Sequence, residues 1–131
     1  MPVQTRRLLV VDDDEGIRAM LEMALSMEGF EVHVAADGEQ ALTVAATLLP
    51  DLIVLDVMMP RLGGHEVLKE LRRSPPTSGT PVIMATALSG DEATWEGLVA
   101  SADGYIRKPY DLAVLIDEID RIDRGRPALP T

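Results

Sequence analysis

The chain has 131 residues, 47% of them apolar, which is the length of one domain and enough to bury a core. Its formal net charge of −10 would repel phosphate backbones, so we expect no direct binding to nucleic acid. It contains no cysteine, which excludes disulfides and thiolate metal sites, and no apolar run reaches membrane-spanning length, so we expect a cytoplasmic protein without a membrane partner.

Short apolar runs alternate along the chain with segments of helical periodicity. Strands are expected at residues 7–11, 31–35, 52–55, 82–85 and 104–107. The helices that follow them are expected to span or contain residues 15–28, 37–48, 67–71, 91–100 and 112–122. Such alternation with short connections favours right-handed crossovers. We therefore predict an α/β fold, a doubly wound five-stranded parallel sheet in the order 2-1-3-4-5 with helices on both faces.

Acidic and hydroxyl side chains follow three of these apolar runs. Asp12 and Asp13 follow the first run, Asp56 the third and Thr86 the fourth. Because the carboxyl ends of parallel strands meet at one edge of a sheet, we expect these side chains to lie close together. Clustered carboxylates need a cation, and an all-oxygen site without His or Cys suits magnesium. Lys108, after the fifth strand, adds a cation that can pair with phosphate, so the sequence predicts a magnesium and phosphoryl site.

Four motifs carry a resemblance to a known family. They are VVDDDE at residues 10–15, LDVMMP at 55–60 with Gly64 after it, PVIMATA at 81–87, and DGYIRKP at 103–109. Several motifs in a fixed order are far more specific than one short motif. From about residue 7 to residue 122 the chain resembles the receiver domain of bacterial two-component response regulators, which has the flavodoxin-like fold of the chemotaxis regulators. We expect a receiver domain at residues 1–124 and a short tail at 125–131.

The resemblance implies a role for each residue of the expected site. It assigns the phosphoacceptor, Asp56; the magnesium ligands, Asp12, Asp13, Asp56 and the backbone carbonyl of Met58; and two residues that contact phosphoryl oxygens, Thr86 and Lys108. Tyr105 would be the aromatic switch residue, and the bond between Lys108 and Pro109 would be a cis peptide. The phosphodonor would be a histidine kinase or a phosphotransfer protein. The domain would be a phosphoacceptor switch rather than a turnover enzyme, with output through a downstream protein or an output domain that this chain lacks.

Other interpretations of these residues stay open at this point. Asp12 and Asp14 form a D-x-D after an apolar strand, as in phosphatases of the haloacid dehalogenase type, although that family needs threonine or valine where Gly16 stands. A third possibility is a binding module that is never phosphorylated. Asp14 also fits a helix cap, and Tyr105 also fits ordinary core packing.

The sequence leaves open whether two sets of apolar residues are buried in the core or exposed for a partner. Met20, Met23 and Met27 form a stripe on the first expected helix that could be extra core or a docking surface for the kinase. Trp95, on the fourth expected helix, could be core or an anchor for an output partner.

The residues two positions after Asp56 and Thr86 bear on the lifetime of a phosphoryl group. They are Met58 and Leu88, both apolar, which cannot hold a water molecule in line with the phosphorus. The sequence therefore predicts a long-lived phosphoryl state.

Overall fold

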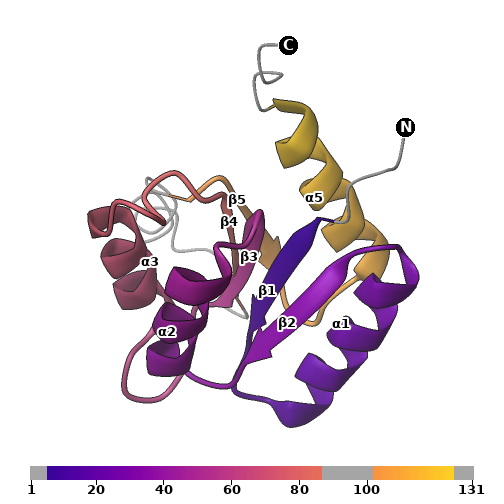
Figure 1. The fold of residues 1–131 in the computed structure, drawn as a ribbon. Coiled ribbons are helices and arrows are strands. Elements are labelled where there is room, and N and C mark those ends of the chain that lie inside the picture. The colour runs from indigo at the N-terminus through magenta and orange to yellow at the C-terminus, as the bar shows by residue number, and fades with distance from the viewer. Residues whose placement is uncertain (1–5, 87–101, 126–131) are drawn as a thin grey trace.

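The computed structural model describes residues 6–86 and 102–125, and its five strands form one parallel sheet (Figure 1). The strands are β1 (Arg7–Val11), β2 (Glu31–Ala35), β3 (Leu52–Asp56), β4 (Val82–Thr86) and β5 (Gly104–Arg107). Their order is β2-β1-β3-β4-β5, so the predicted order and the predicted α/β class are confirmed. The described helices are α1 (Glu15–Met27), α2 (Gly38–Leu48), α3 (Gly64–Arg73) and α5 (Leu112–Gly125). The helix expected at 91–100, with Trp95, lies outside the described residues.

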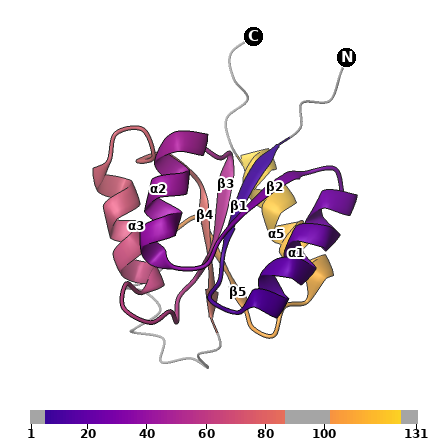
Figure 2. The ribbon, with the colours of Figure 1, turned by 60° about the horizontal axis from the view of Figure 1, so that its bottom comes forward.

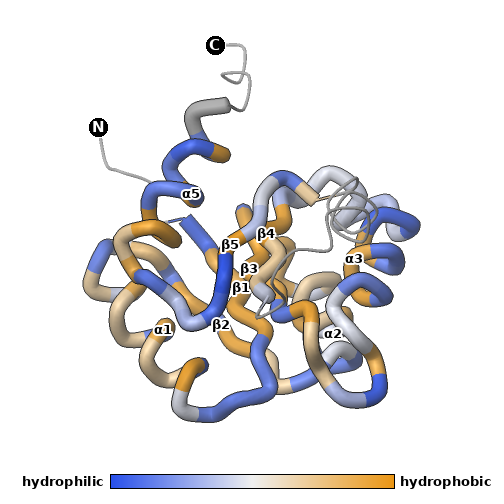
Figure 3. The backbone as a smooth tube through the Cα atoms, turned by 180° about the vertical axis from the view of Figure 1, so that it is seen from behind, coloured by the Kyte–Doolittle hydropathy of each residue, from blue (hydrophilic) through white to orange (hydrophobic). Residues whose placement is uncertain are grey.

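Helices cover both faces of the sheet, as predicted (Figure 2). Alternate residues of a strand point to opposite faces, and in β1 Leu9 and Val11 face α2 and α3 while Leu8 and Val10 face α1 and α5. The central strands β1, β3 and β4 form the apolar centre of the molecule (Figure 3). Every residue of β3 and β4 is buried, which explains why these strands appear in the sequence as unbroken apolar runs.

Local side-chain bonds set the beginnings of two helices. The Asp14 carboxylate accepts a hydrogen bond of 3.1 Å from the backbone N–H of Ile17, so its expected role as a helix cap is confirmed. Asp37 caps α2 in the same way, through the backbone N–H of Gln40 at 2.8 Å. None of the helices in the described part of the chain is both long and apolar enough to cross a bilayer.

Two strands run one residue further than expected. β3 includes Asp56 and β4 includes Thr86, because Asp56 pairs with Ala85 and Thr86 pairs with Arg107 in the parallel ladders. The sequence pattern missed these residues because the expected strands were drawn as apolar runs. The polar side chains are therefore held by the rigid sheet itself rather than by the loops that follow it.

Gly64 lets the loop after β3 fold back against the end of that strand. A Cβ atom at Gly64 would lie 2.2 Å from the backbone oxygen of Asp56 and 2.8 Å from the Cα of Val57. The backbone N–H of Gly64 donates to the Val57 carbonyl at 3.0 Å. Only a residue without a side chain fits between this strand end and the start of α3.

We expect Gly64→Ala to lower the free energy of unfolding by roughly 3 kcal/mol, because the clash is with backbone atoms that cannot turn aside. Urea denaturation measures the change. The matched control is Gly79→Ala, since a Cβ there would meet no atom within 4 Å. Equal losses in the two variants would contradict the close-packing explanation.

Candidate functional site

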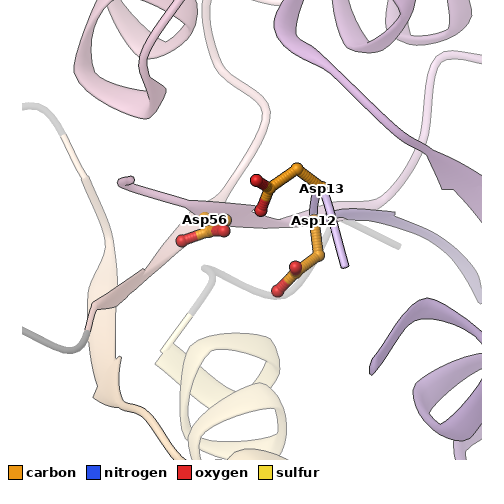
Figure 4. Close-up of side chains that lie close together, drawn as sticks. All are labelled: Asp12, Asp13 and Asp56. Atoms are coloured by element: carbon orange, nitrogen blue, oxygen red, sulfur yellow. The ribbon is translucent and has the colours of Figure 1, made fainter. Parts of the chain in front are cut away.

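Three carboxylates lie together where β1 and β3 end. Asp12 and Asp13 follow β1 directly, Asp56 is the last residue of β3, and these strands are neighbours in the sheet. One carboxylate oxygen from each of the three residues lies within 4.8 Å of those of the other two. Figure 4 shows the three side chains gathered at this edge of the sheet. Asp12 and Asp56 are 0% and 1% exposed, whereas Asp13 is exposed. The predicted cluster therefore forms, with two buried carboxylates and one at the surface.

Lys108 brings a positive charge to this cluster from the end of the edge strand β5. It follows β5, and its backbone N–H donates to the Thr86 carbonyl at 2.8 Å. Its Nζ atom lies 2.8 Å from Oδ2 of Asp12 and 3.1 Å from Oδ2 of Asp56. The Lys108–Pro109 peptide is cis, as expected. One ammonium group therefore bridges the two buried carboxylates.

The environment of Lys108 keeps it charged. Burial by itself would lower the pKa of Lys108, but the hydrogen bonds and negative charges of Asp12 and Asp56 together raise that pKa above its ordinary value. The ammonium is therefore a permanent part of the site at neutral pH.

Asp56 responds differently to the same surroundings. Burial raises the pKa of Asp56 to about 6, the charge of Asp12 adds to the increase, and the hydrogen bonds from Lys108 and from the backbone N–H of Met58 oppose it. Three carboxylates meet a single ammonium at this edge, so the site is short of positive charge even with Lys108 in place. A further cation at this edge would complete the neutralisation.

Asp12 is held by several donors from its own chain. Its Oδ1 atom accepts from the backbone N–H of Asp14 at 2.9 Å, and its backbone carbonyl accepts from Nη1 of Arg18 at 2.7 Å. The Tyr110 hydroxyl donates to Oδ2 of Asp12 at 3.5 Å. These contacts fix both the backbone and the carboxylate of Asp12.

Tyr110 and Arg18 were not predicted as site residues. Tyr110 also lies beneath Lys108, whose Nζ is 5.7 Å from the centre of the Tyr110 ring. Burial, followed by the charges of Asp12 and Asp56, raises the pKa of Tyr110, so its hydroxyl keeps its proton and acts as a donor. An aromatic residue after Lys-Pro suggests only core packing, and the sequence holds no signal for its second role.

The remaining predicted residues lie near this edge in different settings. Thr86 is the fully buried last residue of β4, next to β3. Met58 donates its backbone N–H to Oδ1 of Asp56 at 3.1 Å, and its side chain is 59% exposed. Tyr105 lies on the edge strand β5 and is 54% exposed, so the core-packing alternative for Tyr105 is wrong. Leu88 lies outside the described residues.

The methionine stripe of α1 faces outward. Met20, Met23 and Met27 are 47%, 67% and 82% exposed, whereas Leu21 and Leu25 of the same helix are buried in the core. The extra-core interpretation of the stripe is therefore wrong. Methionine occurs both in cores and on adaptable surfaces, which is why the sequence alone left the question open.

The raised pKa of Asp56 predicts how stability depends on pH without metal. The folded protein holds the Asp56 proton up to about pH 6 and the unfolded chain releases it near 3.8, so stability falls as pH rises between these values. At pH 7, Asp56→Asn should be more stable than wild type by roughly 1 to 2 kcal/mol, because the neutral amide avoids the cost of a buried charge but gives up the charged bond to Lys108. Near pH 4 the difference should shrink. Denaturation in a chelator at both pH values measures it, and a gap that widens toward pH 4 would refute the assignment.

Sequence relatives of the chain are regulators. A protein of Cyanophora paradoxa named as a probable transcriptional regulator, ycf27, is 48% identical over 110 residues, which make up 84% of this chain and 45% of that protein. Response regulator PleD of Caulobacter vibrioides is 42% identical over 118 residues, which make up 90% of this chain and 26% of PleD. The chain thus spans about half or less of the length of these relatives.

Solved structures agree with the fold. Chemotaxis protein CheY4 of Vibrio cholerae superposes with a TM-score of 0.84 at 34% identity, covering 91% of this chain and 99% of that one. Response regulator TrrA of Thermotoga maritima, in complex with Mg(2+)-BeF, has a TM-score of 0.80 at 32% identity and covers 90% of this chain and 99% of its own. The family model of the response regulator receiver domain matches residues 8–120. This chain therefore belongs to the receiver domains of two-component response regulators.

Proposed function

We propose that Asp56 is the residue that accepts the phosphoryl group in this receiver domain. The observation that carries the proposal is the Lys108 ammonium, 2.8 Å from Asp12 and 3.1 Å from Asp56 at the edge where three carboxylates meet. Asp56 is held in this arrangement by the end of β3 and by the backbone N–H of Met58. Such a carboxylate is positioned for attack and has a cation beside it to stabilise transferred charge.

The donor set fits magnesium. Asp12, Asp13 and Asp56 offer only oxygen atoms, which lie close enough to share one ion, and the Met58 carbonyl would be the fourth protein ligand. The exposed Asp13 gives the ion a route from solvent. When bound, Mg²⁺ would neutralise the carboxylates and the oxygens of the phosphoryl donor. The relative TrrA is described in complex with Mg(2+)-BeF, which supports the same choice of metal here.

The proposed transfer is a single displacement at phosphorus. A carboxylate oxygen of Asp56 forms the new bond to phosphorus, and the bond from phosphorus to the donor's leaving atom breaks, with its electron pair staying on that atom. Lys108 and the Thr86 hydroxyl would hold the phosphoryl oxygens. The chemistry needs the charged form of Asp56, and added cation at the site lowers the raised pKa that burial gives it.

The phosphorylated domain would act as a signalling switch rather than as an intermediate of a catalytic cycle. An aspartyl phosphate adds about −1.5 to −2 charges at the end of β3, which can draw the Thr86 hydroxyl toward it. Thr86 and Tyr105 lie on the neighbouring strands β4 and β5, and Tyr105 pairs with Met84 in that ladder. We propose that Tyr105 changes its packing in response.

The partners are proposals of the same kind. The phosphodonor would be a histidine kinase or a phosphotransfer protein, and Met20 and Met23 on the exposed stripe of α1 would contact it. RpaA of Synechocystis, 36% identical over 124 residues, is described as a DNA-binding dual master transcriptional regulator, and this chain covers 52% of it. We propose output through a separate protein or a further domain. The cytoplasmic location stays a prediction.

The alternative phosphatase interpretation has no support in the geometry. It would use Asp12 and Asp14 together, but Asp14 caps α1 through the backbone N–H of Ile17 and is not a member of the carboxylate cluster. A receiver that is never phosphorylated remains an outcome of the test below.

Incubation with acetyl phosphate and Mg²⁺ should add one phosphoryl group to the wild type, measured as intact mass, and none to Asp56→Ala. The matched control is Asp14→Asn, because asparagine also caps helices and Asp14 lies outside the cluster, so this variant should be labelled like wild type. Labelling that persists in Asp56→Ala would contradict the assignment. A wild type without any label would support a binding module instead.

Met58→Asn should shorten the lifetime of the phosphoryl group. The Met58 side chain is exposed two residues after Asp56 and cannot orient water, whereas an amide there can hold one in line with the phosphorus. Loss of labelled protein in Mg²⁺ is followed over time. Met27→Asn, at the far end of α1 and 82% exposed, is the control for the substitution itself. Equal lifetimes in Met58→Asn and wild type would contradict the explanation that the residue at position 58 controls the position of the water.

A further inference from the structure

Tyr110 joins the core to the phosphoryl site. Its ring packs against the apolar cluster between the sheet and the helices α1 and α5. Its hydroxyl points at Oδ2 of Asp12 from 3.5 Å, a longer contact than an ordinary O–H···O hydrogen bond. The same oxygen accepts from Lys108 at 2.8 Å. Two donors of very different strength therefore share one oxygen atom, and the charged one holds the shorter contact.

Asp12 depends on these two donors because it is fully buried. Its Oδ1 is taken by the backbone N–H of Asp14 at 2.9 Å, and its Oδ2 by Lys108 and Tyr110. With 0% exposure, no bulk water replaces a donor that leaves. A buried carboxylate oxygen without a donor is costly, so whatever removes Lys108 from Asp12 is opposed unless another group takes its place.

Phosphoryl transfer to Asp56 would draw Lys108 away from Asp12. Lys108 now bridges Oδ2 of Asp12 and Oδ2 of Asp56. Once Asp56 carries a phosphoryl group, the negative charge on that side lies further out, on the phosphoryl oxygens. The ammonium would follow the charge, since it is a compact point cation on a flexible stem. Its bond to Asp12 would then lengthen or break.

We propose that Tyr110 is a positioning residue for this transfer: its hydroxyl takes over Oδ2 of Asp12 as Lys108 turns toward the phosphoryl group. The inference rests on the proposed role of Asp56 as phosphoacceptor. The long contact of 3.5 Å is the resting arrangement, in which Lys108 occupies the better place on the oxygen. The ring, 5.7 Å from Nζ, provides an aromatic surface for the ammonium at the start of its movement.

Tyr110→Phe should slow phosphoryl transfer and leave the resting site almost unchanged. Phenylalanine keeps the ring and the packing, and before transfer Asp12 keeps its bond to Lys108. A bound Mg²⁺ would take one oxygen of the Asp12 carboxylate, and the proposal places the ion away from Oδ2, whose partners are Lys108 and Tyr110. In the variant, Oδ2 then has no donor after Lys108 turns, so the transition state and the product lose a hydrogen bond that the resting state keeps. The labelling rate should therefore fall by about two- to tenfold, the worth of one hydrogen bond.

A double-mutant cycle separates this role from a structural one. Labelling rates with acetyl phosphate at saturating Mg²⁺ are measured with and without the Tyr110→Phe substitution, once in the wild type and once in a Lys108→Met background. Lys108→Met slows labelling by itself, so only the ratio within each background counts. We expect a two- to tenfold ratio, about the worth of one hydrogen bond, with Lys108 present and a ratio near one without it, because no lysine then leaves Asp12. The same ratio in both backgrounds, or no effect with Lys108 present, overturns the proposal.

Magnesium affinity gives a second, independent readout. In Tyr110→Phe without a phosphodonor, Lys108 still donates to Asp12, so the dissociation constant for Mg²⁺ measured by calorimetry should stay close to that of wild type. A loss of Mg²⁺ affinity by the same factor as the loss of labelling rate would mean that Tyr110 merely shapes the site, and would overturn the proposal. Failure of the wild type to be labelled at all would instead refute the phosphoacceptor assignment, so the two failures are distinguishable.

Discussion

The bridge that Lys108 makes between Asp12 and Asp56 is the contact on which the site depends. Two buried carboxylates that meet at one sheet edge repel each other, and the ammonium lies 2.8 Å from one and 3.1 Å from the other. Lys108 offsets only part of the cost of burying Asp56: its hydrogen bond lowers the pKa of Asp56, but burial still holds that pKa at about 6. A site with partly compensated negative charge, an exposed third carboxylate and a lysine ammonium is suited to receive a metal ion and a phosphoryl group together.

The parallel sheet brings these groups together, and the buried core behind the strands fixes their positions. β1 and β3 lie side by side, so their acidic ends meet, while β5 at the far edge supplies Lys108. Asp56 and Thr86 belong to the sheet ladders, so their backbones are as rigid as the buried strands behind them. Gly64 allows the following helix to start directly against the end of β3. Rigid placement of reacting groups lowers the cost of orienting them at each transfer.

Much of this arrangement could be predicted from the sequence, because its causes are local. Unbroken apolar runs predicted the buried strands, and the acids after them predicted the cluster of Asp12, Asp13 and Asp56. The family resemblance, rather than any pattern of spacing, supplied the separate roles of the residues. Tyr110 was missed because its second role depends on where its hydroxyl ends, and sequence spacing says nothing about that. The exposure of the methionine stripe was open because methionine suits core and surface alike.

The central claim is that Asp12, Asp13 and Asp56 form one cation site, and calorimetric titration with Mg²⁺ tests it most directly. The account predicts one ion per chain in the wild type and in Asp14→Asn, whose side chain caps α1 outside the cluster, and much weaker binding in Asp13→Asn. Asp13 is the informative position because it is exposed and its removal leaves the buried bridge of Lys108 intact. Binding of Mg²⁺ to Asp13→Asn with the affinity of the wild type would contradict the account.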